Sequence, residues 1–298
     1  MAFLSKYGTL WGQIPNAVGR VFFVAPSSPY YLDGRAYDAS DDVNDGLSPE
    51  RALSTVARAL VLVRLSAGNP IDSGSSIATR STTDTICLLP GTHTATALLR
   101  VQAQGVTITG LPNGVEMNGA YPSLSHTILA MTGTSQHLLS VEASDVTIAN
   151  LTLRPTSGFI GVIFRNNPTV DNLRIRNVVF DLASQAVSTN TAGIDFAYRA
   201  DSATIVHGSY STKAGSQAAA ATPIATAYLS GVTFLARDGI GRGIEQATAS
   251  VTAKNVWFRH AQNGTWATPY HLATGAANSY LEGGLFTTMR TMSVTIKC

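Results

Sequence analysis

The chain has 298 residues, of which 45% are hydrophobic and only 13% are charged. Such an apolar composition excludes an intrinsically disordered chain, because enough surface can be buried to offset the entropy of ordering. The 20 basic and 18 acidic residues leave a formal net charge of +2, and no cluster of Lys and Arg occurs, which disfavours a nucleic-acid partner.

The sequence carries no feature of secretion or membrane insertion. Its first residues lack the basic and apolar regions of a secretory signal, and there is no apolar run of ~18 residues. Cys87 lies within an apolar stretch and Cys298 is the last residue, which is not the pattern of a disulfide framework. We therefore expect a protein that is made in a reducing cytoplasm, whatever its final location.

Residues 1–35 are expected to form an extended N-terminal arm with a short strand over residues 20–25. Gly and Pro interrupt the apolar side chains of this segment and prevent a long helix. So short a segment cannot build its own core, so its apolar side chains must pack on the body of the chain or on a partner. We expect a partner, and the predicted partner-binding residues are Trp11, Ile14, Phe22 and Phe23.

Residues 36–83 are expected to hold an acidic, turn-rich stretch and then a capping helix over residues 49–65. Ser48, Pro49 and Glu50 form a helix start, since the hydroxyl can cap backbone N–H groups, Pro suits the first turn and Glu complements the helix dipole. Apolar residues then recur at helical spacing. One face of the helix is therefore apolar and must cover something.

From residue 84 onward one pattern recurs, in which two apolar residues alternate with two others and are followed by Asn or Gly. Such alternation places successive side chains on opposite faces of a strand, and Asn or Gly tolerates the left-handed backbone of a sharp bend. Repeats at intervals of about 20–50 residues are typical of solenoids, in which each unit buries its apolar face against its neighbours. We therefore predict stacked parallel sheets over residues 84–298. The predicted inward-facing residues are Ile108, Ile148, Ile175, Val206, Leu229 and Leu281.

The residues that open the expected coil resemble a known superfamily. Residues 39–56, then Ala59-Leu60, then residues 84–93, which end in Pro-Gly-Thr-His93, are similar to the start of pectin-lyase-like proteins. In that superfamily a capping helix precedes a first strand that ends in Pro-Gly-Thr. The resemblance implies an all-β fold, a single-stranded right-handed parallel β-helix with an N-terminal extended arm and a capping α-helix.

The arm carries a second resemblance. Residues 8–15 and 19–26 are similar to the start of bacteriophage virion β-helix proteins. This resemblance implies a place on the outer surface of the virion, with the major capsid protein or another virion protein as partner, and association as a homotrimer. The low share of Lys points the same way, since Arg, which is favoured at interfaces, makes up most of the 20 basic residues.

No set of residues predicts catalysis, a metal site or a cofactor. Enzymes on this fold that cleave polysaccharides need converging carboxylates, or an Asp cluster that binds Ca²⁺. Asp181 and Asp195 could approach each other on adjacent coils, although two solvated turn residues are the simpler interpretation. The stretch from Asp41 to Gly46 resembles part of a Ca²⁺-binding loop, but Val43 occupies a ligand position and turn formation explains the other residues.

Three other residue groups have a structural and a functional interpretation. Trp257, Phe258 and Trp266 could form a platform on which sugars stack, whereas packing in a core or an interface is the commoner use. His93 is expected to be a structural residue beside the Pro-Gly-Thr turn. Cys87 is expected to be a small buried side chain.

These observations favour a non-enzymatic structural protein of a phage virion, most simply a capsid decoration protein docked through its N-terminal arm. The alternative is a tailspike-like β-helix protein that binds or cleaves host surface polysaccharide, which would make a host glycan a partner. A free carbohydrate-active enzyme is the least favoured function, because a secretion signal and clustered acids are missing. Neither nucleic acid nor a membrane is expected as a partner.

Overall fold

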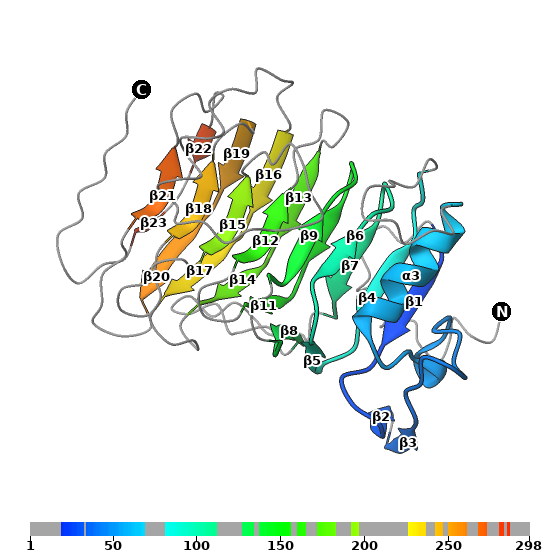
Figure 1. Ribbon diagram of the computed structural model, residues 1–298. Helices are drawn as coiled ribbons and strands as arrows, with labels where there is room; N and C mark the ends of the chain where they lie inside the picture. The colour runs from blue at the N-terminus through cyan, green and yellow to red at the C-terminus, as the bar shows by residue number, and fades with distance from the viewer. Residues whose placement is uncertain are drawn as a thin grey trace.

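The computed structural model describes fourteen stretches of the chain and arranges them around one long axis (Figure 1). The predicted partner-binding residues Trp11 and Ile14 lie outside the described residues. The described ranges are 19–32, 34–68, 81–111, 127–133, 137–155, 160–164, 172–182, 192–196, 226–236, 242–246, 250–260, 268–272, 280–282 and 285–286.

Three parallel sheets run side by side along this axis, and each complete coil of the chain contributes one strand to each sheet. Sheet 1 contains, in order, β1 (Val21–Val24), β4 (Thr85–Leu88), β7 (Thr107–Gly110), β10 (Thr147–Ala149), β13 (Leu173–Arg176), β16 (Thr226–Ser230), β19 (Ser250–Lys254) and β22 (Tyr280–Glu282). Sheet 2 contains β5 (Gly91–Ala95), β8 (Thr127–Met131), β11 (Thr152–Arg154), β14 (Val179–Asp181), β17 (Thr233–Ala236), β20 (Trp257–His260) and β23 (Leu285–Phe286). Sheet 3 contains β6 (Leu99–Val101), β9 (Leu139–Val141), β12 (Ile160–Phe164), β15 (Ala192–Phe196), β18 (Arg242–Gln246) and β21 (Thr268–Leu272).

The strand order confirms the predicted parallel β-helix. Each strand of sheet 1 from β4 onward is hydrogen-bonded to the strand three elements later, and sheets 2 and 3 follow the same rule. A chain that returns to the same sheet after every third strand, always in parallel, winds as a helical coil. Because neighbouring coils pair edge to edge, every internal strand satisfies its backbone groups on both sides.

The inner face of sheet 1 carries a continuous row of aliphatic side chains. Ile108, Ile148, Ile175 and Leu229 are paired in register and are essentially inaccessible to solvent, as predicted. On sheet 2 the rings of Phe180 and Phe234 stack with centroids 4.8 Å apart. The remaining two residues predicted to face inward are not tested, because Val206 and the side chain of Leu281 lie outside the described residues.

The bends between sheet 1 and sheet 2 have the predicted left-handed backbone. The φ angles are 55° at Asn150, 51° at Asn177, 64° at Gly231 and 53° at Asn255. Adjacent bends are tied together, since the Asn177 side-chain amide donates to Asn150 Oδ1 at 3.2 Å. Residues that tolerate a positive φ are therefore needed at this corner of the coil.

Sheet 3 was not predicted from the repeat, which accounts for two strands in each coil and not for three. Its strands pair in parallel like the others, for example Val162 with Leu139 and Ile194 with Ile244. Stretches of varied length separate these strands from those of sheet 2. The third strand is therefore specified by pairing with its neighbours more than by a regular local sequence.

A helix covers the N-terminal end of the core, as predicted, but it begins later than expected. Pro49–Arg51 forms only the short 3₁₀ helix η1, at whose start the Ser48 side chain makes no capping hydrogen bond. The α-helix α3 spans Val56–Ser66 and is capped by the Thr55 hydroxyl, which accepts from the backbone N–H of Arg58 at 3.1 Å. Between the two helices Leu53 pairs with the first strand, which breaks the predicted single helix. The buried residues of α3 are Val56, Ala59, Leu60, Val63 and Arg64.

The strand expected within the arm is present, but it belongs to the body of the coil. β1 pairs in parallel with β4 along its whole length. Phe22 packs in the main core with Val24, and Phe23 packs on the opposite face of the strand with Tyr30 and Cys87. Both phenylalanines are buried within the chain, which corrects the expectation that they bind a partner.

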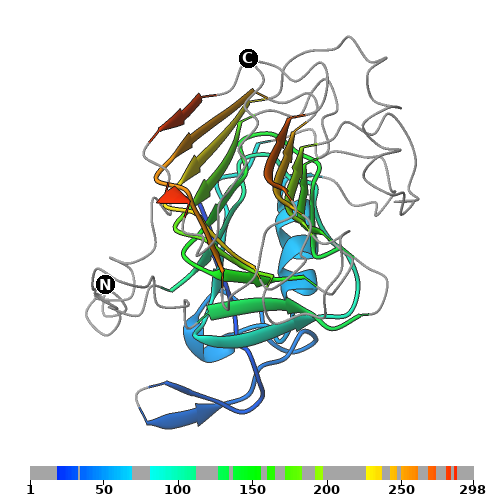
Figure 2. The same ribbon diagram turned by 90° about the vertical axis from the view of Figure 1, so that its left-hand side faces the viewer.

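The part of the chain between β1 and α3 forms a small lobe on the outer face of sheet 1, at its N-terminal end. It contains the antiparallel hairpin of β2 (Tyr30–Leu32) and β3 (Arg35–Tyr37), which projects away from the coil (Figure 2). The Tyr30 hydroxyl donates to the carbonyl of Pro49 and accepts from the N–H of Ala52, which ties the hairpin to η1. Among the described residues no helix is long and apolar enough to cross a membrane.

Candidate functional site

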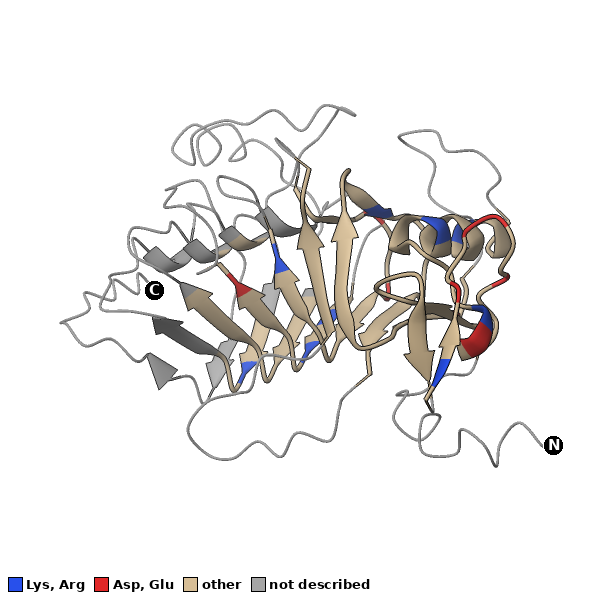
Figure 3. Ribbon diagram, turned by 90° about the horizontal axis from the view of Figure 1, so that it is seen from below, with Lys and Arg blue, Asp and Glu red and all other residues tan. Residues whose placement is uncertain are grey.

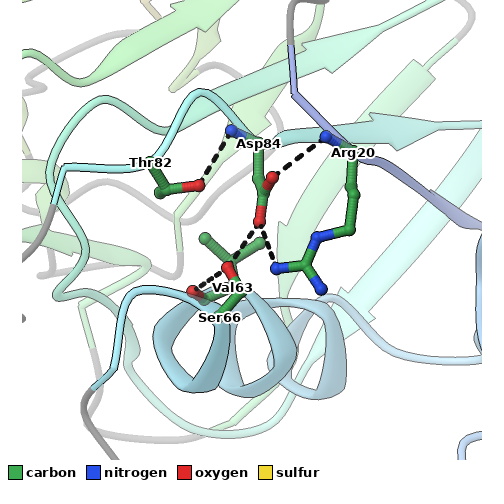
Figure 4. A network of polar contacts seen from close by, with 5 residues as sticks. All are labelled: Arg20, Val63, Ser66, Thr82 and Asp84. Atoms are coloured by element: carbon green, nitrogen blue, oxygen red, sulfur yellow. Dashed lines mark hydrogen bonds and ion pairs between the residues drawn. The ribbon is translucent and has the colours of Figure 1, made fainter.

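The first candidate groups are the buried carboxylates, because a catalytic acid on this fold must come from among the acidic residues of the coil. Asp84 lies at the start of β4 and meets both the first strand and the capping helix (Figure 4). Its carboxylate accepts from the Arg20 backbone N–H and guanidinium, each at 3.0 Å, and Oδ2 accepts from the Ser66 hydroxyl at 2.5 Å. Asp84 therefore joins β1, α3 and β4 at the boundary of the coil.

Glu142 has a similar role at the end of β9. Its carboxylate accepts from Arg100 Nε at 2.9 Å, from Gln102 Nε2 at 3.1 Å and from the Ser140 hydroxyl at 2.8 Å. Arg100 and Gln102 belong to the preceding coil. The charge of Glu142 is thus balanced across two neighbouring coils, which offsets the cost of burying it.

Asp181 is not the solvated turn residue that the sequence suggested. It is the last residue of β14, it is buried, and its Oδ2 lies 2.9 Å from Nε of Arg154 on the adjacent strand β11. Asp195 lies on β15, in sheet 3, whereas Asp181 lies in sheet 2. The arrangement gives Asp181 a structural partner, and the side chain of Asp195 lies outside what the structure describes.

The acidic turn near residue 41 uses its polar side chains to build the lobe. Asp41 accepts from the backbone N–H groups of Ser54 and Thr55, at 2.9 and 3.0 Å, and so holds the start of α3. The Asn44 side chain donates to the carbonyls of Asp38 and Ala52, both at 2.8 Å. These bonds agree with the turn interpretation, and the described residues contain no group of three or more potential metal ligands.

His93 and Cys87 are both buried, as expected of structural residues. His93 Nε2 lies 2.8 Å from the carbonyl oxygen of Leu89, across the Pro-Gly turn. Burial lowers the pKa of His93, although this hydrogen bond opposes the shift. Burial also raises the pKa of the Cys87 thiol, which keeps it protonated and unreactive at neutral pH.

A groove of about 1060 Å³ crosses the outer face of sheet 1, beyond the part that the lobe covers. Its lining residues are Gln104, Ser144, Asp145, Asn172, Arg174, Arg176, Tyr228, Leu229, Ser230, Thr252 and Lys254. Strand register orders the outward side chains into two rows. One row runs Arg174, Tyr228, Thr252, and the other runs Arg176, Ser230, Lys254.

One carboxylate lies at the edge of the groove, where the chain enters sheet 1. Asp145 accepts from Gln104 Nε2 at 2.8 Å and from Asn172 Nδ2 at 2.5 Å. Both Asp145 and Asn172 have a positive φ, at 60° and 62°, so short polar side chains are needed there for the bend as well. The groove therefore has an amide-rich edge around Asp145 and a cationic floor around Arg174 and Arg176.

Charge is unevenly distributed along the protein. Several acidic residues lie close together in the stretch from Asp38 to Glu50, near the N-terminal end (Figure 3), whereas Asp84, Glu142, Asp145 and Asp181 are spread along the coil. The residues of the groove were not predicted as a site, because Arg174, Tyr228 and Lys254 are far apart in the sequence and meet only through strand register. Of the predicted aromatic platform, Trp257 and Phe258 are consecutive on β20, and Trp266 lies outside the described residues.

Comparison with known proteins gives a likeness at the level of the fold. No family model matches the sequence, and no curated protein matches it. Among solved structures, the pectin methylesterase PemA from Erwinia chrysanthemi is 10% identical with a TM-score of 0.38, over 81% of this chain and 66% of that one. The pectin methylesterase from Aspergillus niger is also 10% identical with a TM-score of 0.38, over 84% of this chain and 90% of that one.

This chain thus spans just under two thirds of the bacterial enzyme, at 66% of its length. A likeness of this kind concerns the fold and says nothing about the reaction or the substrate. The parallel β-helix itself is established by the strand pairings described above.

Proposed function

We propose that the protein is a non-enzymatic structural component of a bacteriophage particle, a capsid decoration protein that docks through its N-terminal end. The observation that supports the non-enzymatic part is the use of three buried carboxylates of the coil. Asp84, Glu142 and Asp181 each pair with an arginine of the same chain, so these acids stabilise the coil and are not available as an acid–base pair. The assignment to a phage particle rests on the sequence resemblance of residues 8–15 and 19–26.

The proposed docking surface lies at the N-terminal end of the coil. Because Phe22 and Phe23 belong to the core, we propose the exposed apolar residues of the lobe as binding residues in their stead. Trp11 and Ile14 stay in the proposal and lie outside the described residues. The lobe exposes Tyr31 (71%), Val43 (76%) and Leu47 (47%), and its hairpin projects from the body (Figure 2). A contiguous patch of exposed apolar side chains is typical of protein interfaces, and we propose that these three residues contribute to one. The proposed partner is the major capsid protein or another virion protein, with the decoration protein bound as a trimer.

The experiment is a binding assay with particles that lack the protein. Two variants test the surface: Tyr31→Ser combined with Val43→Ser, and a deletion of residues 1–18 that stops before β1. The matched control is Tyr228→Ser, which removes an exposed tyrosine from the groove far from the lobe.

We expect native circular dichroism for all three proteins and at least tenfold weaker particle binding for one or both of the lobe and deletion variants. The control should bind normally. Equal binding by all variants would contradict docking through the N-terminal end, and failure of the unmodified protein to bind any particle would contradict the virion assignment.

A further inference from the structure

We infer that the outer side of the capping helix α3 is a docking surface for residues 11–18 of the same chain. In the free protein these residues lie across α3 and cover the side that faces away from the core. The inference concerns the purified protein and goes beyond the proposed docking, in which Trp11 and Ile14 contact a particle. It begins from the sequence of α3, in which apolar residues occur all round the helix.

The outer side of α3 carries an apolar stripe of its own. Ala57, Val61 and Leu65 follow one another at intervals of four residues, which places them on one side of the helix. Ala57 is exposed, Val61 is half-buried and Leu65 is 45% exposed. Within α3 only Arg58 adds an exposed charge, since Arg64 is buried. A helix that is apolar all round is normally covered on every side, so this stripe needs a cover.

The chain enters the coil beside the last turn of α3 (Figure 4). The Gly19 N–H donates to the Thr83 carbonyl at 3.2 Å, and the next N–H, that of Arg20, donates to a carboxylate oxygen of Asp84 at 3.0 Å. The Ser66 hydroxyl, at the end of α3, donates to the other oxygen of this carboxylate at 2.5 Å. The first described residues are therefore fixed next to the residue that ends the helix.

The leading segment, residues 1–18, lies outside the described residues, and its length and composition suit the stripe. Residues 11–18 span about 26 Å when extended, at about 3.3 Å per residue. Helix α3 has 11 residues and is about 16 Å long, so these residues can cross its whole length. Lys6 is the only charged side chain of the leading segment, whereas Trp11, Ile14 and Val18 are apolar. Packing on α3 removes both apolar surfaces from water.

A second copy of the chain is the competing occupant of the stripe. A segment that is joined to its target by a short linker has an effective concentration in the millimolar range, which a second copy in dilute solution does not reach. In addition, α3 contains arginines and no acidic residue, so two copies of the helix would bring like charges together. The leading segment of the same chain is therefore the favoured occupant.

The contact gives the proposed docking residues a place in the free protein. Exposed apolar patches favour unwanted association, and Trp11 and Ile14 are covered while they lie on α3. Docking through these side chains then requires the leading segment to leave the helix. This last step rests on the proposed function, whereas the contact itself does not.

The test measures how fast a thiol on α3 reacts with iodoacetamide in the full chain. Leu65→Cys is combined with Cys298→Ser, and Cys87 is kept because it is buried. The matched control is Tyr228→Cys in the same background, since Tyr228 and Leu65 are each 45% exposed. We expect native circular dichroism for both proteins, and a reaction at least tenfold slower for the Leu65→Cys thiol than for the control thiol.

Variants of the leading segment then identify what covers the helix. Trp11→Ser combined with Ile14→Ser should raise the reaction rate of the Leu65→Cys thiol at least fivefold. The same pair of substitutions should leave the rate of the Tyr228→Cys thiol within twofold. The slow reaction should persist unchanged over a hundredfold range of protein concentration, because a contact within one chain is not subject to mass action.

Three results would overturn the inference. Equal rates for the two thiols would show that nothing covers α3. A slow rate that the substitutions at Trp11 and Ile14 leave unchanged would assign the cover to another part of the chain, and a rate that falls as protein concentration rises would assign it to a second copy. No particle is present in these measurements, so a failure here and a failure of the proposed docking can be told apart.

Discussion

The ion pair between Arg154 and Asp181 gives the most direct test of the structural role of the coil acids. The pair joins neighbouring strands of sheet 2 at 2.9 Å, and the two side chains are 28% and 6% exposed. Arg154→Met removes the guanidinium and leaves the buried carboxylate without this partner. Breaking a fully buried pair in this way costs about 3–5 kcal/mol. Since Arg154 is partly hydrated and Asp181 has further contacts, we expect a loss of about 2–3 kcal/mol in the free energy of unfolding.

The assay is urea unfolding followed by circular dichroism, with the dependence on urea compared between proteins to confirm a common unfolded state. The matched control is Arg51→Met, which breaks a pair with Asp45 at 3.5 Å whose side chains are 58% and 44% exposed. We expect this control to lose only about 0–1 kcal/mol. Adding Asp181→Leu to Arg154→Met should restore part of the stability, because the buried charge that has lost its arginine is then removed as well. Equal losses for Arg154→Met and the control would refute the structural role of the pair.

Three further predictions concern the core, a buried histidine and catalysis. Phe234→Ala should lower the free energy of unfolding by about 3–5 kcal/mol, measured by urea unfolding, whereas the exposed Tyr31→Ala should change it by at most about 0.5 kcal/mol. Because burial lowers the pKa of His93, its contribution to stability should be complete above its unfolded pKa of about 6.5 and decrease as the pH falls below that value. The urea midpoint should thus fall less between pH 7 and 5 in His93→Gln than in the unmodified protein, and equal slopes would contradict this. Incubation with host capsular polysaccharide or lipopolysaccharide should release no reducing ends or unsaturated products, and release that is lost in Asp181→Asn would make this residue catalytic.

The parts of the fold that could be predicted are those specified by local sequence. The bends at Asn150 and Asn177 need a left-handed backbone, and few residues tolerate it, so the sequence marks them directly. The alternation around Ile148 and Ile175 likewise marks the inner face of sheet 1. The capping helix could be predicted from its apolar face. The residue at which it begins could not, because the pairing of Leu53 with β1 is a tertiary contact.

The parts that could not be predicted depend on contacts between distant residues. Phe22 and Phe23 stand in a continuous apolar run, and the sequence cannot show that β4 on one edge and the lobe above cover that strand. The groove could not be predicted for the same reason, since Arg174 and Tyr228 become neighbours only through the register of β13 and β16. A signal was nevertheless present, because both residues stand at the outward position of the same repeat. Aligning the repeats with one another would have placed them in one row.

Imaging of purified phage particles, with and without the protein, tests the central proposal most directly. The difference density should show an elongated coil attached to the capsid surface by the end that carries the β2–β3 hairpin, with its far end directed outward. Density at the tail, attachment through the groove on sheet 1, or the absence of any difference between the two particles would contradict the account.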